Sequence, residues 1–161
     1  MLAVVKKTGE GYTARFERRL KHSVEKVWAS LTKNEKLAQW FGQLQIQELR
    51  PGGIIRFDMK NGTFEELEIL EVKEKEVLEY TWGKDRVRFE LYPEGDGCRL
   101  VLIETIVQMT GHTPKDLAGW QVCLGLLEAA VDGQPKELDK SEWEVYYAQY
   151  EAELKPWLEE K

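Results

Sequence analysis

Glu104 is the residue whose chemistry stands out in this sequence. It follows Leu100 and Leu102 at a period of two, so in a strand its side chain points to the same apolar face as theirs. A carboxyl group on that face is costly unless it is paired or neutral, so we expect its pKa to be raised. It could orient the polar group of a ligand. It could instead form an ion pair with Arg18, which follows the same register on an earlier strand, or lie at a bulge near a cavity mouth.

Other residue types that catalyse reactions or bind metals do not cluster. His22 and His112 fall in predicted turns, and neither has a second histidine, a cysteine or a carboxylate at ligand spacing. Cys98 and Cys123 are the only cysteines and form neither a zinc motif nor a redox motif, so we interpret both as reduced and structural. Nucleophile-serine motifs, phosphate-binding glycine loops and H-E-x-x-H are absent. The sequence predicts no catalytic residue, no metal site and no cofactor, and favours a protein that is not an enzyme.

The composition excludes several classes of partner. The chain has 161 residues, of which 42% are hydrophobic and 32% charged, as is typical of one soluble globular domain. Its formal net charge of -6 argues against binding to nucleic acid or to an anionic membrane. A signal peptide and an apolar run long enough to span a membrane are both absent from the sequence. We therefore expect a cytoplasmic protein.

The elements that would position Glu104 form a series of strands. The predicted strands cover residues 12–20, 44–49, 54–59, 63–74, 77–82, 86–92 and 98–110. The segments between the later strands contain residues that tolerate positive φ, and Asn61-Gly62 is the strongest hairpin signal among them. Short turns join antiparallel neighbours, so these strands are predicted to form a meander. With helices on one face, this is an α+β fold.

Helices precede and follow the meander. Two short ones are predicted at 24–32, after the N-cap Ser23, and at 34–41. A long helix is predicted to begin near Pro114 and to end before Gly133. It carries an apolar stripe that must lie on the sheet, formed by Leu117, Trp120, Cys123, Leu124, Leu127 and Val131.

The segment 136–161 is predicted to extend the first 135 residues as a further helix packed on the same domain. It starts near Lys140, and Pro156 should bend or end it. Trp143, Tyr146, Tyr147 and Tyr150 form an aromatic stripe on it. The stripe favours packing on the domain itself, but it could also close a homodimer or bind a partner, so the protein is expected to be a monomer or a homodimer.

Several segments together resemble the activator-of-Hsp90-ATPase (AHSA1-like) branch of the START-like, or SRPBCC, superfamily. They are FERRL at 16–20, VEKVWASLTKNEKLAQWF at 24–41, RPGGIIRFDM at 50–59, LEYTW at 78–82, CRLVLIE at 98–104 and GW at 119–120. The resemblance implies a helix-grip fold in which an antiparallel sheet of six or seven strands wraps a long C-terminal helix around an apolar cavity. Asp116 departs from the family pattern, since many relatives have a histidine at that position.

The resemblance and the apolar pattern together predict a small apolar or amphipathic ligand between the long helix and the sheet. The alternatives are a co-chaperone that binds an Hsp90-type partner and, with less support, a cyclase-like or hydrolase-like enzyme that uses Glu104. Aromatic residues at such spacing also commonly form plain core. The predicted ligand-binding residues are Trp40, Phe57, Met59, Tyr80, Trp82, Phe89, Leu91, Leu102, Glu104, Trp120, Leu124 and Leu127.

Overall fold

The computed structural model describes residues 1–9 and 11–158. In these residues the strands are β1 (Val4–Lys7), β2 (Tyr12–Leu20), β3 (Leu44–Ile46), β4 (Ile54–Asp58), β5 (Phe64–Lys73), β6 (Val77–Trp82), β7 (Asp85–Glu94) and β8 (Gly97–Ile106). The helices are α1 (Val24–Thr32), α2 (Asn34–Leu37), α3 (Thr113–Val131) and α4 (Lys140–Leu158).

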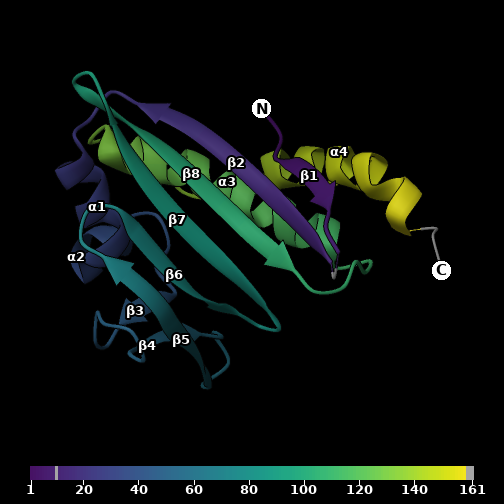
Figure 1. The fold of residues 1–161 in the computed structure, drawn as a ribbon, viewed down its shortest axis with the longest axis horizontal. Helices are drawn as coiled ribbons and strands as arrows, with labels where there is room; N and C mark the ends of the chain where they lie inside the picture. Colours follow the sequence, from purple (N-terminus) through teal and green to yellow (C-terminus); the bar gives the residue numbers. More distant parts are fainter. Residues whose placement is uncertain (10, 159–161) are drawn as a thin grey trace.

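The strands form one antiparallel sheet with the order β1-β2-β8-β7-β6-β5-β4-β3. Figure 1 shows α3 lying across one face of this sheet, with α1 and α2 near one end of α3 and α4 near the other. This is the α+β, helix-grip arrangement that the sequence predicts. The described part of the sheet has eight strands rather than six or seven.

Local signals account for the ends of the helices. The side chain of Ser23 accepts a hydrogen bond from the amide of Lys26 at 3.2 Å and so caps α1. Pro114 lies in the first turn of α3, where its missing N–H costs nothing. After α3, Gly133 has a φ of 80°, the left-handed conformation that glycine adopts most readily. The long helix therefore has the limits that the sequence predicts.

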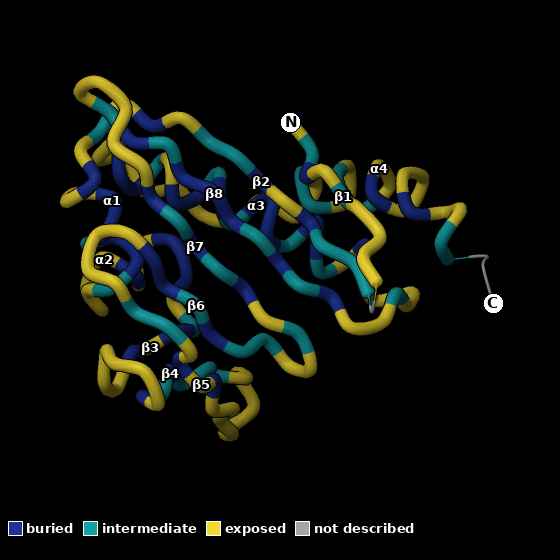
Figure 2. Tube along the Cα trace, in the orientation of Figure 1, coloured by how far each residue is buried: buried dark blue, intermediate teal, exposed yellow. Residues whose placement is uncertain are grey.

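The main core lies between α3 and the sheet. Figure 2 shows the buried residues of β2, β6, β7 and β8 alternating along each strand with less buried ones, as a half-buried sheet requires. On the helix side, Leu117, Trp120, Leu124 and Leu127 are at most 2% exposed. The apolar stripe of α3 therefore lies on the sheet, and the opposite face of the sheet is left to polar residues.

Helix α4 packs along α3 and anchors the N-terminal segment. The hydroxyl of Tyr150 donates to Oε1 of Gln121 at 2.5 Å and accepts from the backbone amide of Ala3 at 2.8 Å. Tyr150 is fully buried, and Trp143, Tyr146 and Tyr147 pack partly buried against the core. The aromatic stripe of α4 is thus used mainly for packing within the chain.

Several local details differ from the prediction. Strand β1 was not expected, because VVKK lacks an alternating pattern and depends on pairing with β2. Strand β3 ends at Ile46 rather than residue 49, and β8 ends at Ile106 rather than residue 110. Helix α2 ends at Leu37, although residues up to 41 were predicted to be helical. Pro156 does not end α4, which continues to Leu158.

Candidate functional site

Glu104 lies in the middle of the sheet with its side chain directed toward α3. It pairs with Ala14 of β2 and Val87 of β7, which are both fully buried. Glu104 is itself 0% exposed. The neighbouring strands therefore place apolar side chains beside the carboxyl group and supply no positive charge.

The group that meets Glu104 from the helix is Asp116, in the first turn of α3. Burial is the main cause that raises the pKa of Glu104 well above its ordinary value. A hydrogen bond with Asp116, the negative charge of Asp116 and that of Asp85 raise this pKa further. Glu104 on the sheet and Asp116 on the helix therefore form a carboxyl pair. Two acids this close to one another can hold one proton between them.

The protonation state decides whether Glu104 has a partner. As an ionised carboxylate, neither of its oxygens would have a hydrogen-bond donor. As a neutral acid, it can donate its proton to Asp116, which is the arrangement that the raised pKa favours. The raised pKa predicted from the sequence is confirmed.

Two of the possibilities considered for Glu104 are wrong, namely the ion pair with Arg18 and a position at a bulge. Arg18 pairs with Leu100 in the sheet register and donates to the backbone carbonyls of Glu17 and Met1 at 2.8 and 3.1 Å. No bulge occurs at Glu104, because its register with both neighbouring strands is continuous.

Trp82 joins the carboxyl pair to a pocket. Its indole Nε1 donates to Oδ1 of Asp116 at 2.8 Å, which holds the carboxylate of a half-buried residue in one orientation. The Trp82 ring lies 5.5 Å from Phe57 and 4.9 Å from Trp120, measured between ring centroids. Trp82 therefore belongs both to the aromatic cluster of the core and to the polar site.

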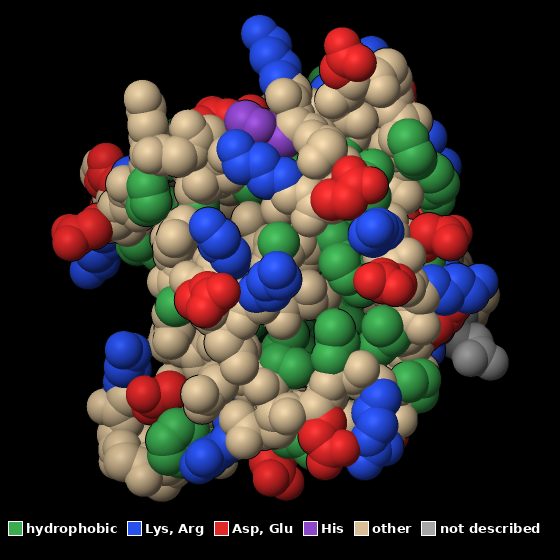
Figure 3. Space-filling model, turned by 90° about the vertical axis from the view of Figure 1, so that its left-hand side faces the viewer, with side chains coloured by type: hydrophobic (Ala, Val, Ile, Leu, Met, Phe, Trp, Pro, Cys, Tyr) green, Lys and Arg blue, Asp and Glu red, His purple; other side chains and the backbone are tan. Residues whose placement is uncertain are grey.

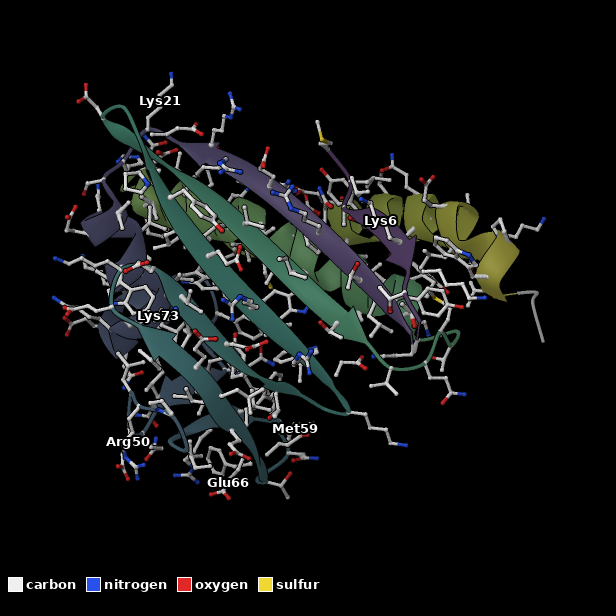
Figure 4. The ribbon with its side chains drawn as sticks, viewed as in Figure 1. Lys6, Lys21, Arg50, Met59, Glu66 and Lys73 are labelled. Carbon is white, nitrogen blue, oxygen red and sulfur yellow. The ribbon has the colours of Figure 1, made fainter. Side chains whose placement is uncertain are left out.

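A pocket of about 300 Å³ opens beside Asp116. It lies where the β4–β5 hairpin, the β6–β7 turn and the loop from β8 to α3 meet. Figure 4 shows Met59 in this region, at the end of the sheet away from Lys21. The lining residues are Phe57, Met59, Glu65, Leu67, Trp82, Gly83, Lys84, Asp85, Gln108, Thr110, His112, Thr113 and Asp116.

The pocket has an apolar wall and a polar rim. Phe57, Met59, Leu67 and Trp82 form the wall, and the charged groups come from the turns and from the start of α3. Wider hollows exist elsewhere on the described surface, such as one of about 610 Å³ beside the β5–β6 turn, but that one is lined largely by charged side chains. The combination of aromatic wall and convergent polar groups is typical of a small-molecule site.

The structure places the predicted ligand-binding residues in two groups. Phe57, Met59 and Trp82 line the pocket. The remaining nine are buried in the core and do not line it: Trp40, Tyr80, Phe89, Leu91, Leu102, Glu104, Trp120, Leu124 and Leu127. Aromatic rings fill the centre of the grip, where Trp120 lies 6.0 Å from Phe89 and 5.8 Å from Phe41 between centroids. The open space is therefore at one end of α3.

Most polar residues of the pocket were not selected from the sequence. Lys84 and His112 come from turns and Asp85 begins β7, and none of these positions belongs to a periodic apolar pattern. Asp116 was noted as a departure from the family pattern but was not among the predicted ligand-binding residues. Its departure from the family pattern was a usable signal for the site.

Both histidines lie in turn or bend segments, as predicted, and each has neighbours that sequence spacing did not indicate. His112 lines the pocket. Nε2 of His22 lies 2.6 Å from Oδ1 of Asp132, a carboxylate that the fold brings from the end of α3.

In the described part of the chain, no group of three or more His, Cys, Asp or Glu residues could hold a metal ion. None of the described helices is both long and apolar enough to cross a membrane.

Two further groups on α3 are affected by burial, namely the thiol of Cys123 and the indole N–H of Trp120. Burial, with a smaller contribution from the charge of Asp116, raises the pKa of the Cys123 thiol to about 12. The indole Nε1 of Trp120 is buried and has no hydrogen-bond partner among the residues that the structure describes. Both lie on α3, and neither lines the pocket. The thiol is therefore protonated at neutral pH and is a poor nucleophile.

The outer face of the sheet carries a network of charged side chains. Arg88 contacts Glu71 at 2.7 Å, Glu90 at 2.6 Å and Glu79 at 3.4 Å, in a partly exposed ion-pair network. Figure 3 shows another face of the molecule, where Lys and Arg side chains alternate with Asp and Glu around smaller hydrophobic groups. That face has no large patch of positive charge.

Comparison with known proteins identifies the fold and the family. Protein EF2215 from Enterococcus faecalis, a conserved protein of unknown function, has a TM-score of 0.85 and 26% identity, over 96% of this chain and 91% of that one. The protein encoded by gene BPP1335 of Bordetella parapertussis has a TM-score of 0.74 and 26% identity, over 98% of this chain and 94% of that one.

CalU16 from Micromonospora echinospora has a TM-score of 0.72 at 20% identity, over 92% of each chain, which shows a shared fold. The comparison with curated proteins gave no match. The sequence pattern of the activator of Hsp90 ATPase homolog 1-like proteins matches residues 21–132. With its START-like, helix-grip fold, this chain therefore belongs to the activator of Hsp90 ATPase homolog 1-like (AHSA1-like) family.

Proposed function

We propose that this protein binds a small amphipathic molecule in the pocket beside Asp116. The observation that carries the proposal is the pocket itself, about 300 Å³ in volume, with an aromatic and aliphatic wall on one side and polar side chains on the other. Its volume is at the lower end of the roughly 300–1,000 Å³ range of ligand sites. The ligand is therefore small, about the size of a bicyclic aromatic compound.

The pocket offers two kinds of interaction. Burial of the ligand's apolar body against Phe57, Leu67 and Trp82 contributes about 25 cal/mol for each Å² removed from water. Asp116, held by the Trp82 indole at 2.8 Å, offers an oriented acceptor at the inner end. Affinity is expected to come mainly from the wall, and orientation from the carboxylate.

The two alternative functions have weaker support. A co-chaperone function would need an exposed docking surface, but the fully buried Tyr150 and the partly buried neighbours in its stripe serve the packing of α4 on α3. An enzyme that uses Glu104 would need this carboxyl to reach a substrate. Glu104 is fully buried and does not line the pocket, so a ligand would meet Asp116 instead.

A binding screen with a blocking variant tests the proposal. The panel contains naphthalene and medium-chain alkyl compounds with neutral, cationic and anionic head groups, observed by ligand-detected NMR and titrated by calorimetry. We expect saturable binding of one molecule per chain. Met59→Trp should weaken it at least about tenfold, because the indole occupies volume that the ligand needs in a closely packed site.

Leu49→Trp is the matched control. Leu49 and Met59 are similarly exposed, at 40% and 43%, but Leu49 does not line the pocket. The control should bind the same compounds as the natural protein. Absence of binding across the panel, or equal loss in both variants, would show that this pocket is not a binding site.

A further inference from the structure

We propose that the pocket selects molecules that carry a protonated amine on an apolar body, with Asp116 as the group that binds the ammonium. This inference rests on the proposed function and adds the chemical class of the ligand. It follows from the charges around the pocket, from the buried carboxyl behind Asp116 and from the aromatic wall.

The pocket carries an excess of negative charge. Glu65, Asp85 and Asp116 line it, and Lys84 is the one lysine or arginine among its described lining residues. Lys84 is exposed on the β6–β7 turn. None of the ion pairs found among the described residues involves Glu65, Asp85 or Asp116. The fold therefore supplies no direct counter-ion to these carboxylates.

The buried carboxyl of Glu104 is an independent indication. It is 0% exposed, and no described residue donates a hydrogen bond to its oxygens. It is directed at Asp116, the member of the pair that lines the pocket. With Glu104 protonated, the pair keeps one negative charge, and that charge is carried where Asp116 meets the pocket. A cation bound at Asp116 would neutralise it, whereas an anion would place a second negative charge beside it.

The ring of Trp82 favours the same class of ligand. Trp82 lines the pocket and its Nε1–H is already used by Asp116, so the indole π-system is what this side chain offers to a ligand. Phe57 extends this wall, with its ring centroid 5.5 Å from that of Trp82. An ammonium group near Asp116 would gain cation–π attraction from these rings in addition to the ion pair.

The charge at one end of the ligand is therefore the property to vary. Naphthylmethylamine, naphthylmethanol and naphthoate with the same ring attachment carry a positive, a neutral and a negative head group on a similar body. Their affinities for the full chain at neutral pH are measured by calorimetry. We expect the amine to bind at least about tenfold more tightly than the alcohol, because charge-assisted hydrogen bonds are roughly twice as strong as neutral ones, and naphthoate to bind most weakly.

Three variants assign the effect to its residue. Asp116→Asn retains an acceptor for Trp82 and should lower the affinity for the amine to that for the alcohol. Asp96→Asn makes the same change of charge in the exposed β7–β8 turn, outside the pocket, and should preserve the preference. Lys84→Gln, on an exposed turn that tolerates substitution, should strengthen amine binding about twofold by removing the one opposing charge.

The possible results separate the inference from the function on which it rests. Equal binding of the alcohol and the amine, or tighter binding of naphthoate, overturns the inference and leaves the proposed function intact. An amine preference that survives Asp116→Asn overturns the assignment to Asp116. Failure of all three compounds to bind overturns the inference and counts against the proposed function as well.

Discussion

Replacement of Glu104 by glutamine tests the buried carboxyl pair through the pH dependence of stability. Burial, Asp116 and Asp85 raise the pKa of Glu104 in the folded protein above the ordinary value of 4.5 that applies to the unfolded chain. As the pH rises from that value toward the folded pKa, the folded protein retains a proton that the unfolded chain has released. The free energy of unfolding must therefore fall with rising pH across this window. Glutamine at position 104 does not ionise, so the variant lacks this pH-dependent loss of stability.

The magnitude follows from one titrating group. A single retained proton changes the free energy of unfolding by at most about 1.4 kcal/mol per pH unit. For a domain of 161 residues, 1 kcal/mol corresponds to roughly 3 °C in the melting temperature. As the pH rises, the melting temperature of Glu104→Gln relative to that of the natural protein should therefore increase by up to about 4 °C per pH unit.

The assay is calorimetric or fluorescence-detected melting of both proteins from about pH 5 to about pH 8. Subtracting one melting curve from the other removes the titrations that the two proteins share. Asp96→Asn controls for the loss of one negative charge at an exposed turn. A melting difference between Glu104→Gln and the natural protein that stays constant over the pH range would refute the reasoning, because it would mean that Glu104 titrates alike in the folded and unfolded chains.

Two further substitutions test the packing that positions the site. Tyr150→Phe removes a buried hydroxyl that bonds Gln121 at 2.5 Å and a backbone amide at 2.8 Å, so urea denaturation should show a loss of about 1–3 kcal/mol. Tyr147→Phe is the control, because the hydroxyl of Tyr147 is exposed and lies 3.3 Å from a carboxylate. This substitution should change the free energy of unfolding by less than about 0.5 kcal/mol. Gly53→Ala should cost about 1–3 kcal/mol, since its Cβ would lie 2.0 Å from a backbone carbonyl oxygen, whereas Gly111→Ala meets no atom within 4 Å. Equal losses within either pair would contradict the assigned contacts.

The family resemblance and the order of elements were predictable because each depends on local pattern. The apolar stripe of α3, ended by Gly133 at a φ of 80°, identified the helix that the sheet grips. The spacing of Glu104 from Leu100 and Leu102 placed its carboxyl on the buried face of β8. The hairpin at Asn61-Gly62 occurs as predicted, with Gly62 at a φ of 88°.

The site was less accessible to sequence reasoning because its residues come from separate turns. Asp116 on α3, Trp82 at the end of β6 and Asp85 at the start of β7 meet only after the sheet curves around the helix. Period and propensity describe which face of an element is apolar, but they carry no information about which turns become neighbours. Nine of the twelve expected ligand residues have the apolar pattern of a cavity wall yet lie in closed core.

By itself, the sequence determined the order and type of the main elements, the buried face of each and the burial of one acid. Those properties follow from the alternation of apolar and polar residues over short distances. Only the tertiary structure decided that Trp120 and Phe89 fill the middle of the grip, that space remains at the start of α3, and that Asp116 rather than Arg18 meets Glu104. The physical reason is that void and charge pairing depend on how side-chain volumes from distant segments fit together, which no local pattern encodes.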